Sequence, residues 1–463
     1  MGEWRSCCAL LALVAAVSCG GAPKPHVLLI TIDTLRADAL GAYGAPPGAS
    51  PRLDRLAREG VLFENAATPM PITRPAHFAL FSSRGPRLLG AMSNAATLPD
   101  GVATLAEALR DVGYQTAAFP AAKLLNEESG IARGFVHFEA PVVDQAIPAE
   151  RALEQVIDWL DAGQEGPWLI WVHLFDPHQP YAPPPRYVPR VDPVRMEQTP
   201  SIAWAELFAA AALHEGDVPA ALLEHARALY AGEVRRVDTV IGRLLDEVEA
   251  RVEERNLLVA ITADHGECFE NGRYFEHADC LFDGATRIPM ILRYPSDLSG
   301  GRRESRPVGL TDLAPGILDL AGIPTPSSFL GRSLFDPERE HEAFVRIELP
   351  HYGPREALFR LRQFARLRSV AGDPTRRPAT RDFPIGLRGS RWKYWQTQSS
   401  TVLYDLEGDP VESSNVAADH PEVVRNLRRR VEQFAKAHPV SEPSAPAVSR
   451  ELEETLRALG YLE

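Results

Sequence analysis

The sequence predicts an α/β fold with a doubly wound, mostly parallel sheet that is covered by helices on both faces, followed by a small C-terminal α+β subdomain. Several short runs are continuously apolar and rich in β-branched residues, which is typical of strands buried on both faces. These runs alternate with amphipathic helical stretches, and this alternation indicates a parallel sheet. Beyond about residue 340 the pattern changes to short strands followed by one helix.

The apolar runs and amphipathic stretches locate the elements in order. Strands of the sheet are predicted at 26–32, 61–63, 115–119, 168–175, 257–262 and 288–293. Helices are predicted at 52–60, 105–112, 150–160 and 222–255, the last with an interruption near Gly232. The C-terminal subdomain is predicted to hold strands at 343–348, 387–396 and 401–406 and a helix at 420–438.

These elements divide the chain into four parts. Residues 1–19 form a signal peptide, 20–342 the large domain, 343–440 the antiparallel C-terminal subdomain, and 441–463 a linker with a terminal helix. The apolar run at 7–17 is too short to cross a membrane, and it ends in small residues followed by Cys19. This ending resembles a bacterial lipoprotein box with Cys19 as the lipidated first residue. We therefore expect an exported lipoprotein that is membrane-anchored through lipid alone and faces the periplasm or the outside. An ordinary cleaved signal is the alternative.

Charge and cysteine content limit the partners. The net charge is −13 and no basic patch is interleaved with aromatic residues, so no nucleic-acid partner is expected. Apart from Cys19, the exported chain keeps Cys268 and Cys280. In an oxidising compartment these two either form a disulfide or remain two buried thiols, and the sequence leaves both open.

Polar residues follow two of the predicted strands. Asp33 follows the first strand, and Asp264 and His265 follow the strand at 257–262. Ligands of open α/β sheets bind at the carboxyl ends of strands, where two close carboxylates repel unless a cation lies between them. We therefore predict a divalent metal bound by Asp33, Thr73, Asp264 and His265. The alternative is four unrelated residues that cap turns.

Thr73 precedes an apolar helical run, in the segment Thr73-Arg-Pro-Ala-His77. A hydroxyl at a helix start faces free backbone donors and the positive end of the helix dipole, which favours an alkoxide or a bound oxyanion. The alternative is an ordinary N-cap.

A second cluster is predicted from Asp176, His178 and His277, which lie near strand ends or in the following loop. These side chains could bind an anionic substrate, protonate a leaving group or hold a second metal. Taken singly, each histidine is also an ordinary loop residue.

Together these motifs resemble the sulfatase-like branch of the alkaline phosphatase superfamily. The resemblance is carried, in order, by Asp33-Thr-Leu-Arg-Ala-Asp, Thr73-Arg-Pro-Ala-His77, Phe175-Asp-Pro-His-Gln-Pro-Tyr181, Thr262-Ala-Asp-His-Gly-Glu267, Thr311-Asp-Leu-Ala-Pro-Gly and Leu403-Tyr-Asp-Leu-Glu-Gly. It extends from about His26 to about His438.

The departures from the family pattern imply a different nucleophile. Thr73 lies where sulfatases have a cysteine or serine that becomes formylglycine, and threonine cannot undergo this conversion. The resemblance implies that Thr73 is the nucleophile, as in phosphoethanolamine transferases and nucleotide phosphodiesterases of the superfamily. His178 and His277 would stabilise the reacting group or protonate the leaving group, and His77 and Lys123 are candidates for assisting substrate binding. Imidazole ligands favour Zn²⁺, with Mn²⁺, Ca²⁺ or Mg²⁺ possible, as one or two ions.

The sequence thus predicts an exported metal-dependent hydrolase that cleaves phosphate or sulfate esters through Thr73, with phosphate esters favoured over sulfate esters. The substrate would be a small-molecule, lipid or glycan ester. Three alternatives remain: a phosphoryl-group transferase with the same site, a sulfatase working without formylglycine, and an inactive relative that binds an anion or glycan.

Overall fold

The computed structural model describes residues 24–142, 146–189, 193–203, 207, 210, 218–269, 277–338, 344–350, 384–397 and 400–440. The predicted signal peptide with Cys19 and the predicted linker and terminal helix at 441–463 lie outside the described residues. Within the described ranges, none of the helices combines the length and the apolar character needed to cross a membrane.

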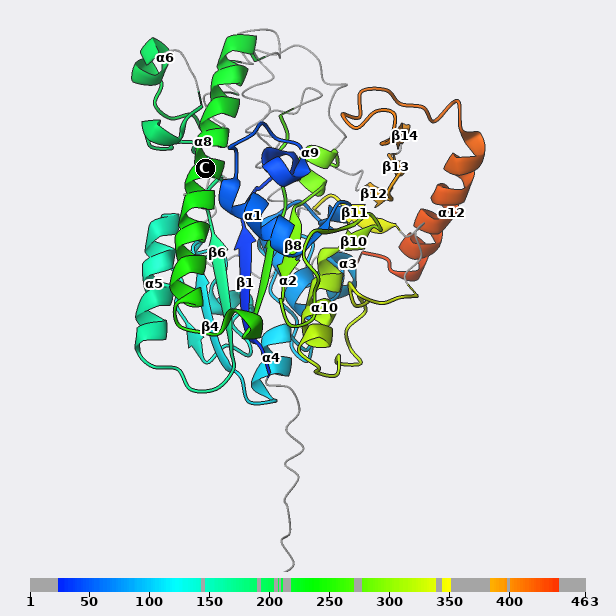
Figure 1. Ribbon diagram of the computed structural model, residues 1–463. Helices are drawn as coiled ribbons and strands as arrows, with labels where there is room; N and C mark the ends of the chain where they lie inside the picture. The colour runs from blue at the N-terminus through cyan, green and yellow to red at the C-terminus, as the bar shows by residue number, and fades with distance from the viewer. Residues whose placement is uncertain are drawn as a thin grey trace, which may run out of the picture.

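An eight-stranded sheet runs through the large domain in the order β5-β4-β6-β1-β7-β8-β2-β9 (Figure 1). Its strands are β1 (His26–Ile32), β2 (Val61–Phe63), β4 (Gln115–Pro120), β5 (His137–Phe138), β6 (Trp168–Leu174), β7 (Leu257–Ala263), β8 (Met290–Arg293) and β9 (Arg302–Glu304). The central strand β1 pairs in parallel with β6 and β7. Residues of β6 and β7 are buried throughout, as the continuous apolar runs predict.

The strand β8 departs from the parallel pattern, because it runs antiparallel to β7 and to β2. The connection between β7 and β8 covers residues 264–289, of which 270–276 lie outside the described residues, and it contains the one-turn helix α9 (Asp283–Thr286). The prediction of a mostly parallel sheet is confirmed.

Helices form one packed group on each face of the sheet (Figure 1). One group contains α1 (Pro51–Glu59), α5 (Ala149–Asp161) and α8 (Ala220–Glu249), and the other contains α2 (Thr73–Ser82), α4 (Leu105–Arg110) and α10 (Leu313–Leu320). The predicted interruption of α8 near Gly232 is wrong, because the helix is continuous. A Cβ atom at Gly232 would lie 2.7 Å from Cγ of Pro183, so this glycine permits close packing against α8.

The C-terminal subdomain is a four-stranded antiparallel sheet in the order β11-β12-β13-β14 with one helix. Its elements are β11 (Val345–Glu348), β12 (Ile385–Arg388), β13 (Trp392–Gln396), β14 (Thr401–Asp405) and α12 (Pro421–Ala437). The single strand predicted at 387–396 is wrong: it is two strands joined by a tight turn, in which Gly389 N–H donates to the carbonyl of Trp392.

Four further short elements complete the described connections around the sheet. A two-stranded parallel pair joins β3 (Ala66–Ala67) to β10 (Val308–Gly309), and the short helix α3 (Pro86–Leu89) follows α2. The α6 helix (Pro193–Gln198) precedes α8.

Candidate metal and active site

Two acidic residues meet at the carboxyl ends of the central strands. Asp33 follows β1 and Asp264 follows β7, and the parallel register places Ile32 opposite Ala263, so the two aspartates lie side by side. His265 Nε2 is 3.7 Å from Asp33 Oδ1 and 3.4 Å from Asp264 Oδ2. Asp33, Asp264 and His265 therefore form a compact group whose ligand atoms could hold one metal ion.

The backbone fixes which atoms of this group remain available. Asp264 Oδ1 accepts hydrogen bonds from the N–H groups of Thr34 at 3.3 Å and His265 at 2.8 Å. Thr34 has a left-handed φ of 53°, and its carbonyl accepts a hydrogen bond from the hydroxyl of Tyr230. His265 Nδ1 lies 3.0 Å from the carbonyl of Gly266, so we infer that its proton is on Nδ1. Asp264 Oδ2 and the lone pair of His265 Nε2, which are 3.4 Å apart, therefore remain available to bind a cation.

Several polar atoms of the group are buried without a partner. Within the described ranges, both carboxylate oxygens of Asp33, Oδ2 of Asp264 and Nε2 of His265 have no hydrogen-bond partner. Each unsatisfied buried polar atom costs about 1–3 kcal/mol. Burial raises the pKa of Asp33, and burial together with the charge of Asp33 raises the pKa of Asp264 well above its usual value.

A divalent cation would remove these penalties, because it favours ionised carboxylates and a neutral imidazole. Burial lowers the pKa of His265 well below its usual value, which keeps this imidazole neutral. Two carboxylates and an imidazole nitrogen suit Zn²⁺ or Mn²⁺ better than Ca²⁺, which takes oxygen ligands. The donor set therefore fits the metal that the sequence predicts.

Thr73 is the first residue of α2, and it is buried. The N-cap of α2 is Ile72, without a side-chain capping hydrogen bond, so the hydroxyl of Thr73 does not serve as the N-cap. His77 Nδ1 lies 2.8 Å from the carbonyl of Thr73 and 3.8 Å from Asp264 Oδ2. This contact places the start of α2 next to the aspartates.

The two ring nitrogens of His77 both contact protein groups. Trp171 Nε1–H donates to Thr31 Oγ1 at 2.9 Å, and Thr31 Oγ1 lies 3.0 Å from His77 Nε2. Because the hydroxyl of Thr31 already accepts from Trp171, we infer that it donates to Nε2 of His77, which leaves the proton of His77 on Nδ1. Burial lowers the pKa of His77 to about 3. His77 therefore holds the start of α2 and lies beneath the site, away from solvent.

Two of the three residues predicted as a second cluster do come together. The rings of His178 and His277 are 5.7 Å apart, and the ring of His277 stacks on that of His265 at 4.3 Å. Asp176 is not brought to them, because its Oδ2 accepts from the N–H of Ala149 at the start of α5 and its Oδ1 lies 3.5 Å from Arg236. The histidines alone reach the candidate site.

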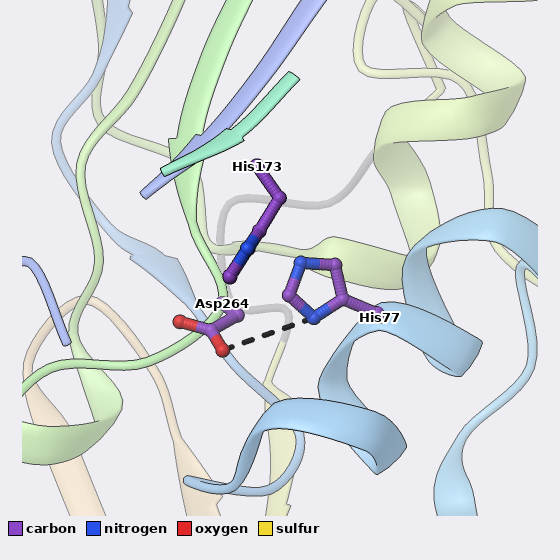
Figure 2. Close-up of side chains that lie close together, drawn as sticks. All are labelled: His77, His173 and Asp264. Carbon is purple, nitrogen blue, oxygen red and sulfur yellow. Dashed lines mark ion pairs between the residues drawn. The ribbon is translucent and has the colours of Figure 1, made fainter. Parts of the chain in front are cut away.

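Glu267 and His173 belong to the site but were not predicted. Glu267 Oε1 is 3.1 Å from His277 Nδ1, and Glu267 Oε2 accepts from the hydroxyl of Tyr181. His173 extends from β6 toward Asp264 and His77 (Figure 2). The available signal was a histidine inside the otherwise apolar strand at 168–175.

Lys123 is half-buried three residues beyond β4, and the N–H of Ala121 in the same segment donates to the carbonyl of His173.

Cys268 and Cys280 form a disulfide, which settles the choice between a bridge and two thiols. The disulfide ties the residue after Glu267 to the loop that carries His277.

Comparison with known proteins identifies the family. Residues 25–323 match the family model described as sulfatase. The chain is similar to the ulvan-active sulfatase of Formosa agariphila, with 26% identity over 391 residues, 75% of this chain and 74% of that protein. It is also similar to the delta 4,5-hexuronate-2-O-sulfatase of Bacteroides thetaiotaomicron, with 25% identity over 451 residues and 87% of each chain covered.

Solved structures share the fold. A protein in complex with its substrate D-glucosamine-2-N,6-O-disulfate matches with a TM-score of 0.70 and 19% identity, covering 91% of this chain and 99% of that one. The phosphonate monoester hydrolase of Agrobacterium radiobacter matches with a TM-score of 0.68 and 22% identity, covering 90% of this chain and 96% of that one. With the family model matched over most of the chain, this protein belongs to the sulfatase family.

Proposed function

We propose that this chain is an exported, metal-dependent hydrolase that cleaves phosphate esters, and sulfate esters more slowly, with Thr73 as the nucleophile. The observation that carries the proposal is the position of Thr73 at the start of α2, where His77 Nδ1 lies 2.8 Å from the carbonyl of Thr73 and 3.8 Å from the unpaired Oδ2 of Asp264. A bound divalent cation would supply Lewis-acid activation of a nearby hydroxyl and of the ester oxygens.

The residues of the chain would divide the reaction as follows. The hydroxyl of Thr73 gives its proton to solvent water and its oxygen attacks phosphorus, while the bond from phosphorus to the ester oxygen breaks and that oxygen takes a proton from the imidazole of His178 or His277. Water then attacks the phosphothreonine, which releases phosphate and restores the hydroxyl of Thr73. If an acceptor alcohol takes the place of water, the same residues catalyse phosphoryl transfer.

The preference for phosphate rests on the nucleophile. A formylglycine hydrate expels sulfate without a second attack at sulfur, whereas the covalent intermediate of threonine must be attacked again at the central atom. Phosphate monoesters also carry more negative charge than sulfate monoesters, which suits a site with a cation and two imidazoles. The fold shared with a phosphonate monoester hydrolase is compatible with chemistry at phosphorus.

A second candidate is a sulfatase that acts on glycans through Thr73. It is favoured by the similarity to proteins named as an ulvan-active sulfatase and a hexuronate-2-O-sulfatase. The deciding measurement is kcat/KM for phosphate and sulfate esters that share one leaving group, on the purified exported protein with Zn²⁺ or Mn²⁺ added.

We expect a higher kcat/KM for the phosphate ester. Thr73→Ala should abolish turnover while retaining part of the metal, and Thr73→Ser should keep measurable activity because only a methyl group is removed. A preference for sulfate that Thr73→Ala abolishes would establish the second candidate. A metal-loaded protein that turns over neither class of ester would instead support an inactive binding relative.

Export and anchoring through Cys19 are part of the proposal. Stable anchoring of a protein takes more than one acyl chain, and a bacterial lipoprotein cysteine would carry several. We expect the wild-type protein in the membrane fraction and Cys19→Ala in the soluble periplasmic fraction. A wild-type protein that is already soluble after lysis would make Ser18-Cys19 an ordinary cleavage site.

A further inference from the structure

His173 is a polar residue in β6, a strand whose residues are all buried. It lies on β6, where the register pairs it with Thr31 of β1, and its side chain is fully buried. Its ring lies 5.1 Å from the ring of His77, which places it on the face of the sheet covered by α2. A buried imidazole in an apolar strand requires a polar partner, because an unpaired buried nitrogen loses its hydrogen bonds to water without replacing them.

No such partner is made within the described part of the chain, where neither ring nitrogen of His173 forms a hydrogen bond. The carboxylate oxygen Oδ2 of Asp33 lies 3.5 Å from His173 Nε2. This oxygen is also without a hydrogen-bond partner among the described residues. Two unpaired atoms of complementary character therefore face one another.

The two oxygens of Asp33 have different neighbours. Oδ1 faces His265 Nε2 at 3.7 Å, on the side of the candidate metal group, whereas Oδ2 faces His173. One cation contacting Asp33 Oδ1, Asp264 Oδ2 and His265 Nε2 would satisfy three of the unpaired atoms and leave Asp33 Oδ2. A shift of about half an ångström would bring His173 Nε2 to hydrogen-bonding distance of this last oxygen.

We propose that His173 is a positioning residue for the metal site, in which its Nε2–H donates to Asp33 Oδ2 and thereby directs Oδ1 toward the cation. This inference rests on the cation site of the proposed function. Carboxylates that ligate a metal are commonly fixed by such hydrogen bonds, and loss of one typically weakens metal binding by about 10–100-fold.

A second cation held by His77, His173 and Asp264 is the competing arrangement, because these three residues also offer ligand atoms within 4.8 Å of one another (Figure 2). His77 would have to bind through Nδ1, the nitrogen that faces Asp264. The carbonyl oxygen of Thr73 already occupies the approach to Nδ1 at 2.8 Å. A cation about 2.1 Å from Nδ1 in that direction would collide with this oxygen, so the geometry favours the positioning role.

The experiment compares metal binding in the full chain and two variants at His173. His173→Leu removes the donor while filling a similar volume, and His173→Gln restores an N–H donor of similar reach. His225→Leu is the matched control, because it removes another buried imidazole whose Nε2 contacts the carbonyl of Thr199, outside the site. Dissociation constants for Zn²⁺ and Co²⁺ are measured by chelator competition, together with the visible spectrum of the Co²⁺ form and the number of ions bound at saturation.

We expect His173→Leu to weaken binding by about 10–100-fold, His173→Gln to recover most of the affinity, and His225→Leu to leave it unchanged, all with the same number of ions at saturation. Unchanged metal affinity in His173→Leu would overturn the positioning role of His173 but not the proposed function. Loss of one ion per chain in His173→Leu would overturn it in favour of a direct ligand. A wild-type protein that binds neither ion would overturn the proposed function as well, which separates the two failures.

Discussion

Two buried charged clusters in this molecule have opposite character. The metal group of Asp33, Asp264 and His265 contains unpaired oxygens and nitrogen, and burial raises the pKa of both carboxyls. The second cluster, which we call the domain ion cluster, consists of Asp283, Arg388, Lys393 and Glu412. It joins α9 of the large domain to β12, β13 and the segment after β14 in the C-terminal subdomain.

Every charge of the domain ion cluster has an opposite charge beside it. Arg388 Nη2 lies 2.7 Å from Asp283 Oδ2, Lys393 Nζ lies 2.7 Å from Asp283 Oδ1, and Lys393 Nζ lies 2.8 Å from Glu412 Oε1. Although burial acts in the other direction, the charges of Arg388 and Lys393 hold the pKa of Asp283 well below its usual range. Two positive and two negative side chains therefore balance without any ion from solvent.

The difference in charge pairing between the two clusters distinguishes a structural cluster from a functional one. Both clusters contain fully buried charged side chains, such as Asp264 in one and Lys393 in the other, so burial alone does not mark a site. What separates them is whether the protein satisfies its own charges. A cluster that is balanced internally holds elements together, whereas one that leaves carboxylates unpaired needs a cation and is the stronger candidate for chemistry.

The largest expected effect is that of Asp264→Asn. Removing this carboxylate should eliminate most of the bound metal and lower kcat/KM by at least about 10³-fold, because the electrostatic stabilisation of the transition state is lost. The metal-free variant should unfold with a free energy no lower than that of metal-free wild type, since a destabilised buried charge is gone. Elemental analysis, ester kinetics and denaturant titration with a chelator measure these quantities. Full metal occupancy in the variant would remove Asp264 from the ligand set.

An aspartate-to-asparagine substitution in the domain ion cluster should lower the stability of the fold and leave metal binding unchanged. Asp283→Asn leaves Arg388 and Lys393 buried with one carboxylate between them, and we expect the free energy of unfolding to fall by about 3–5 kcal/mol. Metal content per folded molecule should remain that of the wild type. Asp405→Asn is the control, because its pair with Arg391 is partly exposed and worth at most about 1 kcal/mol. A stable Asp283→Asn that has lost its metal would contradict the division between the two clusters.

The pH dependence of unfolding should have opposite signs for the two aspartates in metal-free protein. Asp283 has a lowered folded pKa, so its contribution is complete above the ordinary value of 3.8 and is lost as the pH falls below it. Asp264 has a raised folded pKa, so its charged form penalises folding at high pH, and acidification through that raised pKa toward 3.8 relieves the penalty. Differences in unfolding free energy between wild type and each Asn variant, measured from pH 8 to pH 3, test both signs. Free-energy differences that change in the same direction with pH for both variants would refute the opposite signs assigned to Asp283 and Asp264.

One physical rule explains why the sequence predicts that Asp33, Asp264 and His265 come together as a candidate metal group. Asp33, Asp264 and His265 all follow apolar strands, and parallel strands bring their carboxyl ends to one edge. The rule identifies the edge but not the direction of each side chain. Asp176 also follows a strand, yet its carboxylate accepts from the first N–H of α5 and lies beside Arg236, a more favourable environment than the histidine pair.

Residues inside elements were harder to predict than residues at their ends. His173 lies within an apolar run, where its neighbours indicate only a buried strand, and its partner Asp33 is 140 positions away in sequence. The continuity of α8 at Gly232 depends on the approach of Pro183, and the turn after β12 on pairing between β12 and β13. Such features follow from tertiary contacts, which local periodicity does not encode.

Substitution of Glu267 has the smallest expected effect and gives the most discriminating test. Glu267 is a buried carboxylate that lies in the candidate site and yet is paired. Its Oε1 contacts Nδ1 of His277 and its Oε2 accepts from the hydroxyl of Tyr181, so by the criterion above it should orient an imidazole and not bind the cation. Glu267→Gln keeps the shape and one acceptor but removes the charge that favours the proton on Nδ1 of His277. We expect kcat to fall by about 10–100-fold with metal content unchanged. Kinetics at saturating ester and elemental analysis distinguish the two roles. Metal loss comparable to that of Asp264→Asn would place Glu267 among the metal ligands. It would also show that a carboxylate paired with neutral groups can still bind the cation.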